Sequence, residues 1–144
     1  MKTVSFHKID APESDYLYVE QSQIPEAGNG LFTAIDIYDD EMIAIFTGEI
    51  LDDIEAENRA RIGADRYFIV LPEQKILDSM NTDCFAKFAN DAFNQPDLAL
   101  KNNAKIAFDD LDNIGLIALH RIKAGEEIFC SYGKSYWKKW LSKI

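Results

Sequence analysis

Two short runs in the second half of the chain carry its most distinctive pattern. The first is Lys87-Phe88-Ala89-Asn90-Asp91-Ala92, and the second is Gly125-Glu126-Glu127-Ile128-Phe129-Cys130-Ser131-Tyr132-Gly133. The side-chain amide of Asn90 can pair a donor and an acceptor with the edge of a ligand. Tyr132 places a phenol next to Gly133, where the backbone can come close to whatever the hydroxyl faces. We therefore expect the two runs to meet in space and form a site.

The composition is that of one soluble globular domain. The chain has 144 residues, of which 47% are hydrophobic and 28% charged. It contains no apolar run long enough for a membrane span, and its first residues lack the apolar core of a signal peptide. Two cysteines without a CxxC pair predict free thiols in a reducing compartment. Neither a disulfide framework nor a metal site is expected.

The charge balance limits the class of partner. Fifteen Lys and Arg against 25 Asp and Glu give a net charge of −10. Direct binding of nucleic acid is disfavoured, because phosphate contacts require a basic surface. A Lys-rich protein or peptide fits the charge better. The alternative, that the acidity only keeps the protein soluble, stays equally open.

The hydrophobic pattern predicts a β-rich domain of short strands joined by turns. One helix is expected over residues 52–62, capped by Asp52 or Asp53 and stopped by Gly63. An amphipathic helix is expected after Ser131, and residues 1–14 look like a loose leader. Strands are expected at residues 16–20, 31–34, 42–47, 67–71, 75–78, 104–108 and 114–119.

Other motifs are weak when taken alone. Gly28-Asn29-Gly30 is either a tight turn or a place where backbone approaches a small ligand, and it does not match GxGxxG. His7 and His120 stand far apart with no nucleophile beside them, which disfavours a Ser-His-Asp or Cys-His enzyme. The carboxylates are scattered, so no acid–base pair is indicated.

The motifs taken together resemble the SET-domain family of protein lysine methyltransferases, from about Tyr16 to Trp137. The C-terminal motifs look most like those of the compact single-domain viral and bacterial members. This resemblance implies a mostly β, β-clip-like SET-domain fold of small curved sheets, with a C-terminal pseudoknot and a short C-terminal helix. It divides the chain into a leader (1–14), the SET domain (15–137) and the end of the C-terminal helix (138–144). The motifs that carry it, in order, are Gly28-Asn29-Gly30-Leu31-Phe32, Thr47-Gly48-Glu49, Tyr67-Phe68, Phe88-Ala89-Asn90-Asp91-Ala92, Asn103, Lys123-Ala124-Gly125-Glu126-Glu127-Ile128 and Ser131-Tyr132-Gly133.

The resemblance also implies a site and a cofactor, S-adenosyl-L-methionine. Backbone at Ala27, Gly28, Asn29 and Gly30 would hold the methionine part, and Asn90 and Asp91 the adenosine part. Tyr132 would line the methyl-transfer pore and contact the cofactor, with Tyr67 as the second catalytic tyrosine. Trp137 would close over the cofactor or the lysine channel. No metal is needed for this chemistry.

The implied activity is transfer of a methyl group to a lysine of a histone or another basic protein. The chain departs from the common motif at Lys87, Asp91, Ala92 and Cys130. A non-catalytic SET-like binding module is therefore the alternative, and a β-rich domain that recruits partners through its aromatic tail is a third.

A monomer or homodimer is expected, located in the cytoplasm or nucleus, with a secreted effector left open.

Overall fold

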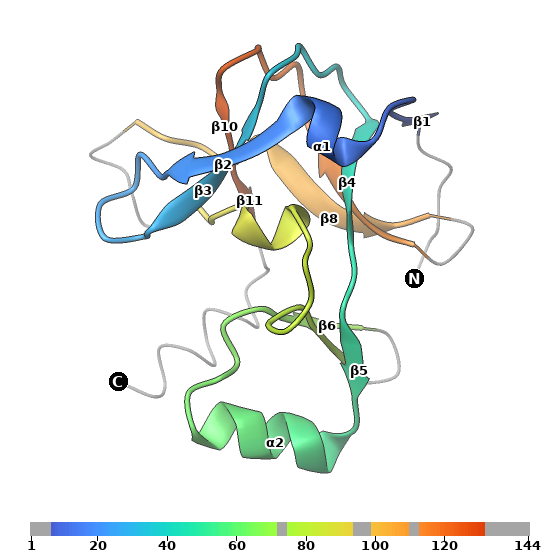
Figure 1. The fold of residues 1–144 in the computed structure, drawn as a ribbon, viewed down its shortest axis with the longest axis vertical. Helices are drawn as coiled ribbons and strands as arrows, with labels where there is room; N and C mark the ends of the chain where they lie inside the picture. The colour runs from blue at the N-terminus through green and yellow to red at the C-terminus, as the bar shows by residue number, and fades with distance from the viewer. Residues whose placement is uncertain (1–6, 72–74, 94–98, 110–112, 132–144) are drawn as a thin grey trace.

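The computed structural model describes residues 7–71, 75–93, 99–109 and 113–131, and this part of the chain is built mostly of short strands. Figure 1 shows a body of two small sheets at the top and a smaller lobe below, with the chain passing from β4 in the body to β5 in the lobe. The predicted mostly-β fold of small sheets with few helices is confirmed.

The largest sheet forms the centre of the body. Its strand order is β1-β4-β9-β8-β11, where β4, β9 and β8 pair antiparallel and the two edge strands pair parallel with their neighbours. Every residue of β9 is buried, as expected for a central strand covered on both faces. The strands are β1 (His7–Lys8), β4 (Glu41–Phe46), β8 (Ala104–Phe108), β9 (Ile114–Ala118) and β11 (Cys130–Ser131).

Two three-stranded antiparallel sheets complete the fold. The order β10-β3-β2 joins β10 (Glu127–Ile128), β3 (Asn29–Thr33) and β2 (Leu17–Gln21) in the body. The order β5-β7-β6 joins β5 (Glu49–Leu51), β7 (Ile76–Asp78) and β6 (Phe68–Val70) in the lower lobe, beside α2 (Asp53–Arg61).

The helix α2 forms where its end signals predicted it. The Asp52 side chain caps the helix by accepting a hydrogen bond from the Glu55 backbone N–H at 2.8 Å. Gly63 adopts a φ of +77°, which glycine reaches without strain, and the helix ends just before it. Arg59 on this helix forms ion pairs with Glu49 and with the fully buried Asp78, and so fastens α2 to the lobe sheet.

The N-terminal segment differs from the expected loose leader. From His7 onward it contains β1, which pairs with β4, and the short helix α1 (Glu13–Tyr16). The Tyr16 hydroxyl donates to the Ile43 carbonyl at 2.6 Å, and its burial raises the pKa of the phenol above its ordinary value. This buried side chain and Glu13, whose carboxylate accepts from the Ile45 N–H, tie α1 to the central sheet. The segment's four-residue helix was too short to leave a periodic signal.

The C-terminal helix expected after Ser131 lies outside the described residues. Within the residues that are described, no helix has the length and apolar character needed to cross a membrane.

Candidate active site

The C-terminal strand segment is inserted between two distant parts of the chain. On one side, Phe129 forms a parallel bridge with Asn90, and the Cys130 N–H donates to the Asn90 carbonyl at 2.9 Å. On the other side, the Phe129 carbonyl accepts hydrogen bonds from the N–H groups of Asn103 and Ala104. The segment therefore lies between Asn90 and Asn103.

The Asn90 side chain connects this crossing to the glycine turn. Its Nδ2 donates to the Asn29 carbonyl at 2.9 Å, although the two residues are far apart in sequence. The sequence-predicted residues Gly28, Asn29, Gly30 and Asn90 are thus brought together, beside the strand that leads to Tyr132. Gly28 has a φ of +76°, which explains a glycine at this position of the turn.

Glu127 anchors the loop that precedes the glycine turn, a role that the sequence analysis did not assign. Its carboxylate, in a residue only 2% exposed, accepts hydrogen bonds from Ser22 Oγ at 2.6 Å and from the Gln23 N–H at 2.8 Å. A Cβ atom added to Gly30 would overlap this carboxylate. Gly30 is therefore required so that β3 can pass close to Glu127. The buried carboxylate fixes the start of the loop that carries Gly28 and Asn29.

Asn103 secures the inserted segment through its side chain. Its Oδ1 accepts from the Phe129 N–H at 2.8 Å, and its Nδ2 donates to the Glu127 carbonyl at 3.0 Å. Asn103 is 8% exposed, so these hydrogen bonds are shielded from water.

Asp91 stands where the common motif has a histidine, and its carboxylate serves the local backbone. Its Oδ1 accepts from the Phe93 N–H and from Asn102 Nδ2, both at 2.9 Å. Asn102 in turn accepts from the Ala92 N–H at 2.8 Å. The acid thereby links residues 91–93 to Asn102.

Tyr67 is positioned by a lysine from the Asn90 run. Lys87 lies in the short 3-10 helix η2 (Ala86–Phe88), and its Nζ donates to the Thr82 carbonyl at 2.9 Å. The same ammonium lies over the ring of Tyr67, 5.3 Å from the centroid. The guanidinium of Arg66 also lies 5.3 Å from that centroid. Tyr67 is therefore held next to the helix that leads into Asn90.

Two predicted site residues, Tyr132 and Trp137, lie outside the described residues. The described chain ends one residue before Tyr132, at Ser131, which pairs with Lys105 in β8. Cys130 is fully buried in the main core cluster, so its side chain faces the core. Among the residues described, no group of three or more His, Cys, Asp or Glu side chains is arranged to hold a metal ion.

Comparison with known proteins agrees with this geometry. A family model described as "SET domain" matches residues 28–133. The chain belongs to the SET-domain family. It is similar to the histone-lysine N-methyltransferases, H3 lysine-36 specific, of Homo sapiens and Mus musculus, with 30% identity over 122 residues in each case. That alignment covers 81% of this chain but only 4% and 5% of those relatives.

This SET-domain chain is also similar to a plant protein. Histone-lysine N-methyltransferase EZA1 of Arabidopsis thaliana is 31% identical over 112 residues, which is 74% of this chain and 12% of that protein. The chain thus spans a small fraction of the length of the curated relatives that it matches.

The glycine turn is exposed beside Asn90, where the family resemblance implied a cofactor. Gly28 and Asn29 are exposed, and a Cβ added to Gly28 would meet nothing within 4 Å. The Asn29 and Gly28 carbonyls each already accept one hydrogen bond, from Asn90 Nδ2 and from the Ser22 N–H, so a ligand would contact the remaining exposed backbone of the turn. The residues present therefore fit a polar ligand that is recognised mainly through backbone atoms.

Proposed function

We propose that this SET-domain protein is an S-adenosyl-L-methionine-dependent protein-lysine N-methyltransferase whose substrate is a histone or another basic protein. One observation carries the proposal. The glycine turn, Asn90 and the strand that leads to Tyr132 converge although they are distant in sequence. The names of the relatives, all histone-lysine N-methyltransferases, support the same activity.

The residues that would hold the cofactor are Ala27, Gly28, Asn29, Gly30, Asn90 and Asp91, with Tyr132 and Trp137. When bound, the cofactor supplies a methyl group on a positively charged sulfur. The Asn29 carbonyl fixes the orientation of the Asn90 amide before any ligand arrives. The hydrogen bond between Ser22 and Glu127 fixes the start of the loop that leads to Gly28. Such preorganisation lowers the cost of ordering the site on binding.

Tyr67 and Tyr132 are proposed to line the channel for the substrate lysine. The Lys87 ammonium, 5.3 Å from the centroid of the Tyr67 ring, favours this position of the ring. An aromatic channel lowers the pKa of a lysine because desolvation disfavours the ammonium form, so the amine loses its proton more readily. The phenol oxygens of these two tyrosines would orient the amine toward the methyl group that the cofactor supplies.

The test is incubation with radiolabelled cofactor and a panel of basic proteins that includes histone H3. Asn90→Ala and Tyr132→Phe should each lower labelling by roughly tenfold or more, as expected when a positioning or transition-state contact is lost. Asn81→Ala is the matched control, because Asn81 is exposed and its Nδ2 makes only a long 3.4 Å contact with Glu49. The labelling of this control should equal that of the unsubstituted protein.

Calorimetry with the cofactor separates the alternatives. Cofactor binding without labelling of any basic protein would favour a non-catalytic SET-like binding module. Absence of cofactor binding by a folded protein at millimolar cofactor would overturn the proposal altogether.

A further inference from the structure

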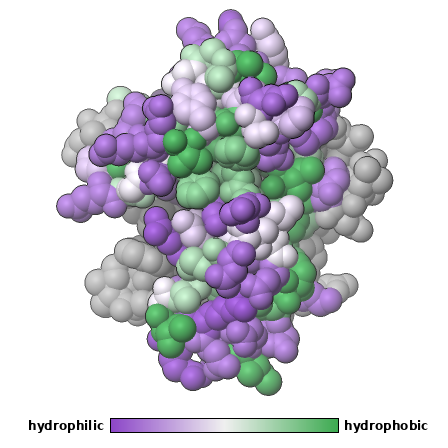
Figure 2. All heavy atoms as spheres, viewed as in Figure 1, coloured by the Kyte–Doolittle hydropathy of each residue, from purple (hydrophilic) through white to green (hydrophobic). Residues whose placement is uncertain are grey.

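A hollow of about 540 Å³ lies on the face of the molecule shown in Figure 2, apart from the glycine turn and Asn90. It is bounded by α1, β2, β4 and the segment that leads into η2. Its volume falls within the usual range of ligand-binding pockets. The lining residues are Glu13, Val19, Ile45, Thr47, Asp83, Cys84, Phe85 and Phe88.

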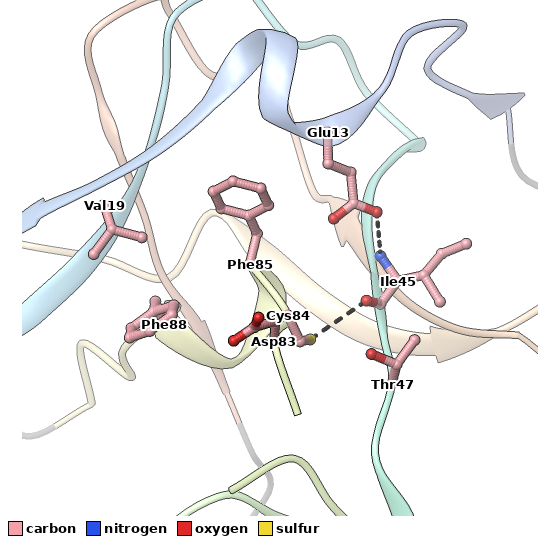
Figure 3. Close-up of a pocket in the computed structure, with 8 residues that line it drawn as sticks. All are labelled: Glu13, Val19, Ile45, Thr47, Asp83, Cys84, Phe85 and Phe88. Carbon is pink, nitrogen blue, oxygen red and sulfur yellow. Dashed lines mark hydrogen bonds between the residues drawn. The ribbon is translucent and has the colours of Figure 1, made fainter. Parts of the chain in front are cut away.

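The wall of the hollow combines apolar side chains with two carboxylates. Figure 3 shows Val19 and the rings of Phe85 and Phe88 around it, with Glu13 and Asp83 coming from different elements. Glu13 is fixed in place because its Oε2 accepts from the Ile45 N–H at 3.1 Å. Asp83 is exposed, and it forms no hydrogen bond or ion pair within the described part of the chain. The hollow is thus apolar with a negative charge on two sides.

The residues that line the hollow include no positive side chain. The nearest lysine along the chain, Lys87, donates to the Thr82 and Ser79 carbonyls, and its ammonium lies over the rings of Tyr67 and Phe88. Lys8 donates to the Tyr16 hydroxyl. The two carboxylates are therefore available to an external cation.

The chemistry that fits this wall is a cation on an aliphatic stem. The stem of a lysine or arginine can lie along apolar side chains while its charged end reaches a carboxylate. The aromatic ring of Phe85 also attracts such a cation, whereas the Phe88 ring already has the Lys87 ammonium 5.4 Å from its centroid. A purely apolar ligand would instead leave the two carboxylates partly desolvated with no partner, which is unfavourable.

We propose that this hollow is a second recognition site, which takes a lysine or arginine side chain of the basic protein substrate at a position other than the methylated lysine. The inference rests on the proposed function for the identity of the partner. The chemistry of the contact rests only on the hollow itself.

Cys84 offers a direct test because it is a half-buried thiol inside the hollow, whereas Cys130 is completely buried and serves as an internal reference. The rate of Cys84 alkylation by iodoacetamide is followed by mass spectrometry, with and without a peptide of alternating alanine and arginine. This peptide contains no lysine, so the result does not depend on methyl transfer. The peptide should slow alkylation of Cys84.

Charge variants localise the effect. Asp83→Asn should weaken the protection by the peptide roughly two- to fivefold, the range expected for one partly exposed ion pair. Asp15→Asn is the matched control, since Asp15 is an exposed acid on α1 that does not line the hollow. Equal loss in both variants, or no protection of Cys84 while fluorescence anisotropy shows that the peptide binds, would overturn the proposal.

Kinetics give a second, separate readout. With a basic protein as substrate, Asp83→Asn should raise KM roughly two- to fivefold and leave kcat unchanged, as for a contact made equally in ground and transition states. A fall in kcat at constant KM would count against a recognition site. If no basic protein is methylated, the proposed function fails, and the alkylation result still decides whether the hollow binds a cationic side chain.

Discussion

Replacement of Glu127 by alanine tests the central support of the site. The change removes the acceptor for Ser22 Oγ and for the Gln23 N–H, at 2.6 and 2.8 Å. Hydrogen bonds to a charged group contribute about 1.5–3 kcal/mol each, and the buried donors would be left without partners. We expect the free energy of unfolding to fall by about 3–5 kcal/mol, a large part of the about 5–15 kcal/mol that a domain of this kind has.

Urea unfolding followed by circular dichroism measures this loss. In a thermal melt, the same loss should lower the melting temperature by about 10–17 °C. Glu127→Gln should cost less, about 1–2 kcal/mol, because the amide oxygen still accepts from Gln23 and the Ser22 hydroxyl can reverse its role.

The matched control is Glu126→Ala, one residue earlier. Glu126 is exposed and accepts a hydrogen bond from the Lys123 N–H within a turn. Removal of the Glu126 carboxylate should lower the free energy of unfolding by less than about 1 kcal/mol, because water can replace the acceptor. If Glu126→Ala and Glu127→Ala destabilise the protein equally, the role assigned to the buried carboxylate is refuted.

Three further predictions follow from the same contacts. Gly30→Ala should lower the free energy of unfolding by about 1–3 kcal/mol, because the new Cβ overlaps Glu127. In a double-mutant cycle, most of this loss should disappear when Glu127 is also replaced by alanine. Additive effects of the two substitutions would contradict the overlap. Gly28→Ala should cost only about 1–2 kcal/mol, the cost of a left-handed φ of +76° in open space, as measured by urea unfolding. Arg59, followed by Asn81, lowers the pKa of Glu49, so this pairing stabilises the fold above the ordinary glutamate pKa of about 4.3 and is lost as the pH falls through the lower folded-state pKa. The melting temperature of Glu49→Gln should therefore lie below that of the unsubstituted protein at neutral pH and converge with it in acid, whereas Glu57→Gln on the exposed face of α2 should show no such trend.

Local signals predicted the elements that local interactions form. Asp52 and Gly63 mark the two ends of α2, and the observed cap and positive φ are those that these residue types favour. The strands expected at residues 104–108 and 114–119 form as β8 and β9, which pair antiparallel. For these segments, neighbours in sequence are also neighbours in space.

Long-range contacts explain what the sequence did not reveal. A glycine is required at position 30 because of the Glu127 carboxylate, which is far from it in the sequence. The contact of Lys87 with Tyr67 likewise joins two elements that no local pattern relates. The convergence of Asn90 with the C-terminal strand was expected only from family resemblance, since no periodicity encodes a crossing. The roles of Tyr132, Tyr67 and Trp137 stay predictions.

The position of the segment 129–131 between Asn90 and Asn103 has a consequence for how the protein is made. Because the segment 129–131 is hydrogen-bonded on both edges by residues that leave the ribosome earlier, the site cannot be assembled until this segment has been synthesised. A truncated product that stops before Phe129 would lack the partner of Asn90 and could not form the proposed site. Delivery of this strand between two segments already made is a step of high contact order, and we expect it to limit the rate of refolding.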